Sequence, residues 1–147
     1  MAWRGWSEQL EAIMSGETDL QRLLNEMSPI LAEREYVYCT VLGDAALWLA
    51  LEPIGTFREA EGMTLILERS KADAAGLSYG PVLRLITLSV HSALEAVGLT
   101  AAVSAALTRA GVSANVVAAY YHDHIFVPTA DADRSLAALH ALSRGNS

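Results

Sequence analysis

The pattern of apolar and polar positions is clearest in the second half of the chain. Residues 83–90 are mostly apolar over the length of a strand, and within 99–110 apolar residues recur every three or four positions, which is typical of a helix with one buried face. Gly111 follows, as glycine often does after a last helical turn. The elements expected from this half are a strand over 83–90, a helix over 99–110, a strand over 114–121, a tight turn at 122–123 and a strand over 124–127.

A further helix is expected over 131–142, with Leu136 and Leu139 on one face. Strand, helix, two strands and helix are the first five elements of a βαββαβ unit. The sequence ends soon after this helix, so the last strand of the unit must come from elsewhere.

The first half gives a similar order of elements, although no repeat is visible at the level of residues. Thr18 is the expected N-cap of a helix whose apolar residues continue as far as Leu31, with Pro29 near its end. The elements expected after it are a strand over 36–42, a helical turn or two over 45–51, strands over 53–59 and 63–68 joined by a turn at 61–62, and a short helix over 71–76 capped by Ser70.

These elements predict an α+β protein made of two ferredoxin-like βαββαβ lobes, each with an antiparallel sheet covered by helices. We expect an N-terminal extension over 1–13, to which no function is assigned, a first lobe over 14–80 and a second lobe over 81–147.

Composition narrows the classes of protein to consider. The 147 residues are 52% hydrophobic and 18% charged, which suits a folded core, and the net charge of −7 disfavours binding to nucleic acid or an anionic membrane. The single cysteine, Cys39, cannot form an internal disulfide, which favours a reducing compartment, and we expect the cytoplasm. No apolar run reaches about 18 residues and no secretion signal is visible.

The residues also carry a family likeness. Residues 97–117 resemble the ACT domain, and more narrowly the regulatory half of aspartate kinases and the tandem-ACT arginine sensors. The shared features are a glycine that opens the first helix (Gly98), a helix of small and apolar residues, the exit Ala110-Gly111-Val112-Ser113 and an apolar strand. Residues 131–140 are similar to the family's second helix, and 57–62 and 120–128 resemble a bacterial group of stand-alone ACT proteins without an attached enzyme.

The resemblance implies a function. ACT domains bind small effectors, often amino acids, at an interface between paired domains, so a homodimer is expected. The ligand's charged ends meet the loop after the first strand, the start of the first helix and the second strand. The residues at those positions are Glu95, Val97, Gly98, Leu99, Thr100, Asn115, Val116 and Val117. Aspartate kinases typically have Asp or Asn before the glycine; here Ala96 and Val97 stand there, with Glu95 just upstream.

Elementary chemistry supports part of this assignment. Backbone N–H groups at the start of a helix suit a carboxylate, Gly98 would let a ligand approach the backbone, and Glu95 would balance an ammonium. The alternative is that Gly98 only makes the turn and that Glu95 is solvated or caps the helix.

The histidines near the second hairpin are the one cluster that suggests other chemistry. His122 and His124 would share one side of a strand and, with His91, would offer three metal ligands. The alternatives are that both histidines flank a tight turn at the sheet edge, or that they contact the effector and make its binding sensitive to pH.

No nucleophile elbow or phosphate loop is present in the sequence. Together with this, the resemblance to ACT domains implies a non-enzymatic amino-acid-binding regulatory module without a cofactor, acting on a separate partner. A metal-binding protein and a purely structural pairing module are the alternatives.

Overall fold

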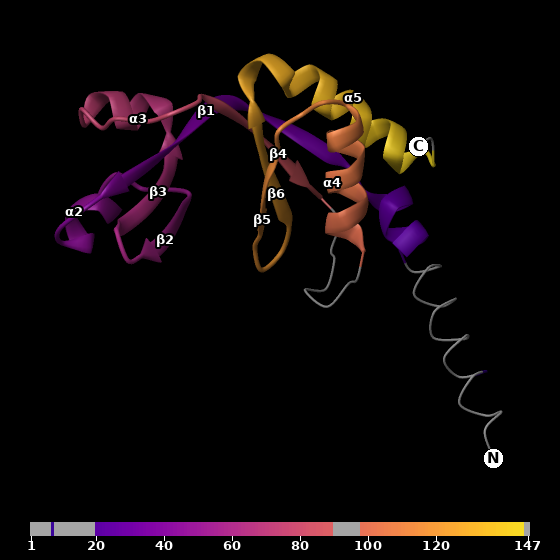
Figure 1. Ribbon diagram of the computed structural model, residues 1–147, viewed down its shortest axis with the longest axis horizontal. Coiled ribbons are helices and arrows are strands. Elements are labelled where there is room, and N and C mark those ends of the chain that lie inside the picture. The colour runs from indigo at the N-terminus through magenta and orange to yellow at the C-terminus, as the bar shows by residue number, and fades with distance from the viewer. Residues whose placement is uncertain (1–6, 8–19, 90–97, 146–147) are drawn as a thin grey trace.

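An antiparallel sheet of six strands runs through the protein in the order β2-β3-β1-β4-β6-β5 (Figure 1). The structure is a computed structural model that describes residues 7, 20–89 and 98–145. The strands are β1 (Pro29–Val41), β2 (Gly55–Glu59), β3 (Gly62–Glu68), β4 (Leu83–Leu88), β5 (Asn115–Ala118) and β6 (Asp123–Pro128). The helices are α2 (Ala45–Leu49), α3 (Arg69–Ala74), α4 (Leu99–Arg109) and α5 (Ala132–Ser143), with a 3₁₀ turn η1 (Thr129–Asp131) and a short helix over 20–26.

The long strand β1 belongs to both halves of the sheet. Its residues from Tyr36 to Val41 pair with β3, and its residues from Pro29 to Tyr36 pair with β4. The second half therefore has the strand order β1-β4-β6-β5, in which β1 supplies the last strand of the βαββαβ unit. The expectation of tandem ferredoxin-like α+β lobes is confirmed. The boundary at 80/81 stays a prediction, since one sheet joins the halves.

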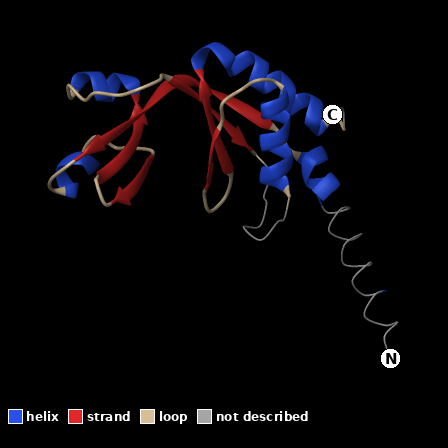
Figure 2. Ribbon diagram, viewed as in Figure 1, coloured by secondary structure: helices blue, strands red, loops and turns tan. Residues whose placement is uncertain are grey.

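Helices lie along one face of the sheet (Figure 2), and two apolar cores are buried between these helices and the strands. In the second half, Ile86 and Ile125 pack beneath Leu107 of α4 and Leu139 of α5, and all four side chains are fully buried. The core of the first half packs strands β1 and β3 against α3 and Trp48, and its buried members are Val37, Cys39, Val41, Leu65, Leu67 and Ala72. No helix within the described ranges is long and apolar enough to cross a membrane.

The opposite face of the sheet carries a third apolar cluster around Phe126. The Phe126 ring meets the rings of Tyr36 and Tyr38 edge to face, with centroids 5.9 Å and 5.6 Å apart. The sheet curls around this face, which is therefore its concave face, with the β2–β3 hairpin on one side and the β5–β6 hairpin on the other (Figure 1). This curl brings the two edge strands of the sheet towards each other.

The predicted first helix is too long. The helix ends at residue 26, and β1 begins at Pro29, where a proline without an N–H fits the first position of a strand. Proline also disfavours helical backbone in the residue before it, here Ser28. Leu31 packs against the same core as the helix. Because it is apolar and fits the helical spacing, it was assigned to the helix although it lies in β1.

The predicted second strand of the second half is also too long. It ends at Ala118, and Tyr120 and Tyr121 lie in a loop closed by the Ala119 N–H, which donates to the His122 carbonyl at 3.1 Å. Asp123 is not in the turn: it begins β6 and is buried.

The predicted cap of the short helix is wrong as well. Helix α3 begins at Arg69, so Ser70 lies inside its first turn. Glu68 occupies the N-cap position, but its carboxylate pairs with Arg34 and does not cap the helix.

Candidate functional site

A groove lies on the concave face of the sheet, between the edge strands β2 and β5. Its volume of about 520 Å³ is within the range of small-molecule sites, roughly 300–1,000 Å³. We call it the edge-strand groove. The residues that line it are Tyr38, Phe57, Glu59, Thr64, Ile66, Ala114, Asn115, Val116 and Val117.

Strands β2 and β3 form the wall from the first half. Phe57 pairs with Thr64, so both side chains lie on the same face, and the Phe57 side chain is 70% exposed. The Thr64 hydroxyl donates a hydrogen bond of 2.5 Å to Glu59 Oε1. Within the described part of the chain no ion pair involves Glu59, which therefore gives this wall an uncompensated negative charge.

The side of the groove nearest the core is aromatic and aliphatic. Ile66 is buried, and Tyr38 is half-buried against Phe126. Burial raises the pKa of the Tyr38 hydroxyl above its usual value, so this group stays protonated at neutral pH and can donate a hydrogen bond.

Strand β5 forms the other wall. Asn115 pairs with Phe126 and Val117 pairs with His124, which places Asn115 and Val117 on the concave face. The three predicted strand residues, Asn115, Val116 and Val117, all line the groove.

Sequence reasoning missed the opposite wall. No ligand-binding role was assigned to Phe57, Glu59 or Tyr38 from the sequence. The available signal was the two-residue spacing of Phe57 and Glu59 on one strand, which puts an exposed aromatic ring and a carboxylate on the same face.

The second part of the predicted site is the start of α4, where the side chains are more closely packed than in the groove. Gly98 is the N-cap of α4 with φ of +98°, and a Cβ at this position would lie 3.0 Å from Leu20 Cδ2. Leu20 thus covers one side of Gly98. Leu99 is 2% exposed and belongs to the core, whereas Thr100 is exposed.

The predicted site is thus divided in the structure. Gly98, Leu99 and Thr100 do not line the edge-strand groove, whereas the three predicted β5 residues do. Glu95 and Val97 lie outside the described residues, so their predicted part in ligand binding stays a prediction.

The histidine cluster has its own contacts. His124 Nδ1 lies 2.9 Å from the Thr87 hydroxyl on the neighbouring strand, and the His122 ring lies 6.5 Å from the Tyr121 ring. Among the described residues, no three His, Cys, Asp or Glu side chains gather where a metal ion would bind. The predicted metal set also needs His91, which lies outside those residues.

We expect protonation of His124 to destabilise the fold. Burial lowers the pKa of His124, the charge of His122 lowers it further, and Asp123 partly offsets both. The unfolded chain therefore binds this proton more readily, so the stability contributed by neutral His124 is complete above pH 6.5 and is lost as the pH falls below it. Urea unfolding between pH 7.5 and 5.5 should show a steeper loss of stability in the native chain than in His124→Gln. Equal pH dependence of the two proteins would contradict this expectation.

A second hollow, beside β1 and α3, is lined by charges that satisfy one another. Its volume is about 570 Å³. Arg34 pairs with Glu68, and Arg69 pairs with Glu35 at 3.3 Å and with Asp73 at 3.7 Å. Because these charges are already matched, the cluster is better explained as structural support where β1 passes between the two halves.

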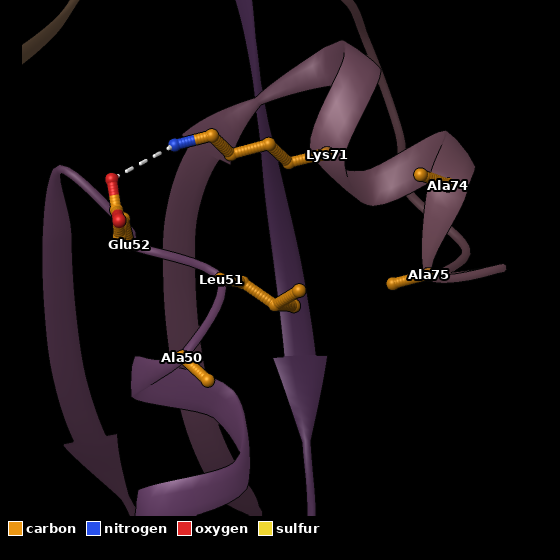
Figure 3. A pocket seen from close by; sticks show the side chains of 6 residues that line it. All are labelled: Ala50, Leu51, Glu52, Lys71, Ala74 and Ala75. Carbon is orange, nitrogen blue, oxygen red and sulfur yellow. Dashed lines mark ion pairs between the residues drawn. The ribbon is translucent and has the colours of Figure 1, made fainter.

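A third hollow, of about 330 Å³, lies between the end of α2 and helix α3 (Figure 3). Its polar groups are Lys71 and Glu52, whose side chains point toward each other across the opening and form an ion pair of 3.6 Å. The remaining lining residues are Ala50, Leu51, Ala74 and Ala75. Since both charged groups are paired, this hollow offers less to a charged ligand than the edge-strand groove does.

Comparison with known proteins identifies the family to which this fold belongs. Two ACT domain family models match, one over residues 15–84 and the other over residues 82–141. A Vibrio cholerae protein of unknown function, named as a possible transport protein, is 53% identical over 87% of this chain and 98% of its own, with a TM-score of 0.80. The comparison with curated proteins finds no match.

Aspartate kinase regulatory domains share the fold at low identity. The ligand-free regulatory subunit from Thermus thermophilus is 9% identical, with a TM-score of 0.60 over 78% of this chain and 95% of its own. The Clostridium acetobutylicum aspartate kinase is 9% identical, with a TM-score of 0.59 over 81% of this chain and 34% of its own. This chain belongs to the ACT domain family and carries two ACT domains in tandem.

Proposed function

We propose that the protein is a non-enzymatic regulatory module that binds an amino acid and transmits its bound state to a separate partner. The observation that carries this proposal is the composition of the edge-strand groove, whose two walls come from different ACT domains. A ligand that touches both walls would favour one relative position of the domains over others. Differential affinity of this kind is what a ligand needs to shift a conformational equilibrium.

The residues named from the sequence give two alternative places where the ligand's charged ends could bind. One is the start of α4, where Gly98, Leu99 and Thr100, with Glu95 and Val97 before them, would receive a carboxylate and an ammonium. The other is β5, with Asn115, Val116 and Val117 on the groove and His124 beside Val117. In this proposal His122 and His124 border the effector site and bind no metal.

We also propose a homodimer. Strands β2 and β5 are the edges of the sheet, so their outer backbone groups are open to pairing with a second copy. We propose a cytoplasmic location because Cys39 is the single cysteine and forms no internal disulfide; burial also raises its pKa and makes the thiol unreactive. A purely structural pairing module would use the same strand edges but would not be stabilised by an amino acid.

We expect at least one free amino acid to raise the thermal stability of the purified protein. A ligand at 100 times its dissociation constant adds about 2.7 kcal/mol to the free energy of unfolding if it binds only the folded state. The measurement is thermal unfolding against the twenty amino acids, with sodium chloride at matched ionic strength as the control. If none of the twenty amino acids raises the unfolding temperature, the sensor function is excluded and the structural pairing module remains.

A further inference from the structure

We propose that the edge-strand groove is the effector site and that it selects an amino acid with a neutral, apolar side chain, held by its ammonium on Glu59. This inference rests on the proposed function and adds the place and the chemical class of the ligand. It follows from the charge, the hydrogen-bonding groups and the apolar surface of the groove.

Charge gives the first argument. Of the described residues that line the groove, Glu59 alone carries a charge. The hydrogen bond from the Thr64 hydroxyl holds one of its oxygens and leaves the other available. A carboxylate that forms no ion pair in the described part of the chain favours a ligand ammonium, with which it would form a charge-assisted hydrogen bond.

The opposite wall suits the other end of a zwitterion. Asn115 brings a side-chain amide with two N–H donors to the groove and carries no charge. A ligand carboxylate would therefore be accepted at the β5 wall and repelled at the Glu59 wall. This polarity matches the two charged ends of a free amino acid.

The apolar lining of the groove determines which ligand side chain is favoured. Phe57, Ile66 and Val117 give the groove an apolar lining, and the Phe57 ring is exposed to solvent. An acidic ligand side chain would be repelled by Glu59, and a basic one would compete with the ligand's own ammonium for the same carboxylate. An apolar side chain would cover Phe57 and remove its ring from water.

The test compares ligands first. Isothermal titration of the full chain would use leucine, methionine and phenylalanine, then aspartate and lysine. Phenethylamine and 3-phenylpropionate, which lack the carboxylate and the ammonium of phenylalanine respectively, would follow. We expect an apolar amino acid to bind most tightly and 3-phenylpropionate to bind more weakly than phenethylamine.

Variants then locate the site. Glu59→Gln keeps an acceptor for Thr64 but removes the charge, and should weaken binding by about tenfold to a hundredfold, as expected when one charged hydrogen bond is lost. Phe57→Ala should also weaken it. Glu61→Gln is the matched control, because Glu61 is exposed on the same hairpin and does not line the groove; it should bind normally.

Two results would overturn the inference in different ways. If an amino acid binds to Glu59→Gln as tightly as to the native chain but fails to bind to Thr100→Glu, which puts a negative charge at the start of α4, the effector lies at that helix and the sensor function stands. If no amino acid binds and Phe57→Ala instead dissociates a dimer in sedimentation velocity, the groove holds a second copy. The homodimer then stands, and both the amino-acid sensor and the groove as its effector site fail.

Discussion

Phe126→Ala is expected to destabilise the protein by about 3–5 kcal/mol, the usual cost of truncating a buried phenylalanine. Phe126 is 2% exposed and contacts the rings of Tyr36 and Tyr38, both on β1. Removing its ring leaves a cavity and takes away two edge-to-face contacts between β6 and the strand that joins the two halves. The free energy of unfolding from urea titration would measure this loss.

The chain supplies its own control. Its second phenylalanine, Phe57, is 70% exposed, so Phe57→Ala makes the same chemical change at a site that buries little surface. Surface substitutions of this kind usually change stability by less than about 0.5 kcal/mol. A similar loss in both variants would show that Phe57 is buried in solution, for example by a second copy of the chain, and would weaken the case for an open groove.

The sequence predicted most of the fold because its strongest signals are local. Helix α4 was found almost residue for residue, since its apolar spacing and the following Gly111 act within a few turns. The start of β1 was missed because Leu31 is apolar in either conformation, and its strand partner Ile86 lies 55 positions away in the sequence. Local periodicity contains no information on that pairing.

The lining of the edge-strand groove was anticipated only in part for the same reason, and its role as a binding site stays a prediction. Asn115, Val116 and Val117 were named from the resemblance, which assigns positions within one ACT domain. Phe57, Glu59 and Thr64 belong to the other domain and reach the groove only because the sheet curls (Figure 1). That curl is a property of the whole sheet and not of any segment, so the second wall was visible only once the strands were assembled.

Leu139→Ala is expected to lower the stability of both domains together, by about 2–5 kcal/mol. Leu139 of α5 is fully buried in the core of the second half. Strand β1, however, pairs with β4 in that half and with β3 in the other, so unfolding of the second half would remove a strand from the first. We therefore expect one cooperative transition and not two.

Trp48 provides the test of this coupling. It packs on the core of the first half, and its indole N–H donates to the Leu42 carbonyl at 2.9 Å. In a Trp3→Phe, Trp6→Phe background its fluorescence reports on the first domain alone, while circular dichroism reports on both. Leu139→Ala should move both urea midpoints down equally.

The control for this substitution lies next to the reporter. Leu47→Ala is the same change at a side chain that is 68% exposed, and it should leave both midpoints almost unchanged. If Leu139→Ala shifts the circular dichroism transition but not the Trp48 transition, the two ACT domains unfold independently. In that case ligand binding to one domain would not be coupled to the other through β1. Only a ligand bound across the groove between β2 and β5 could then couple the two domains.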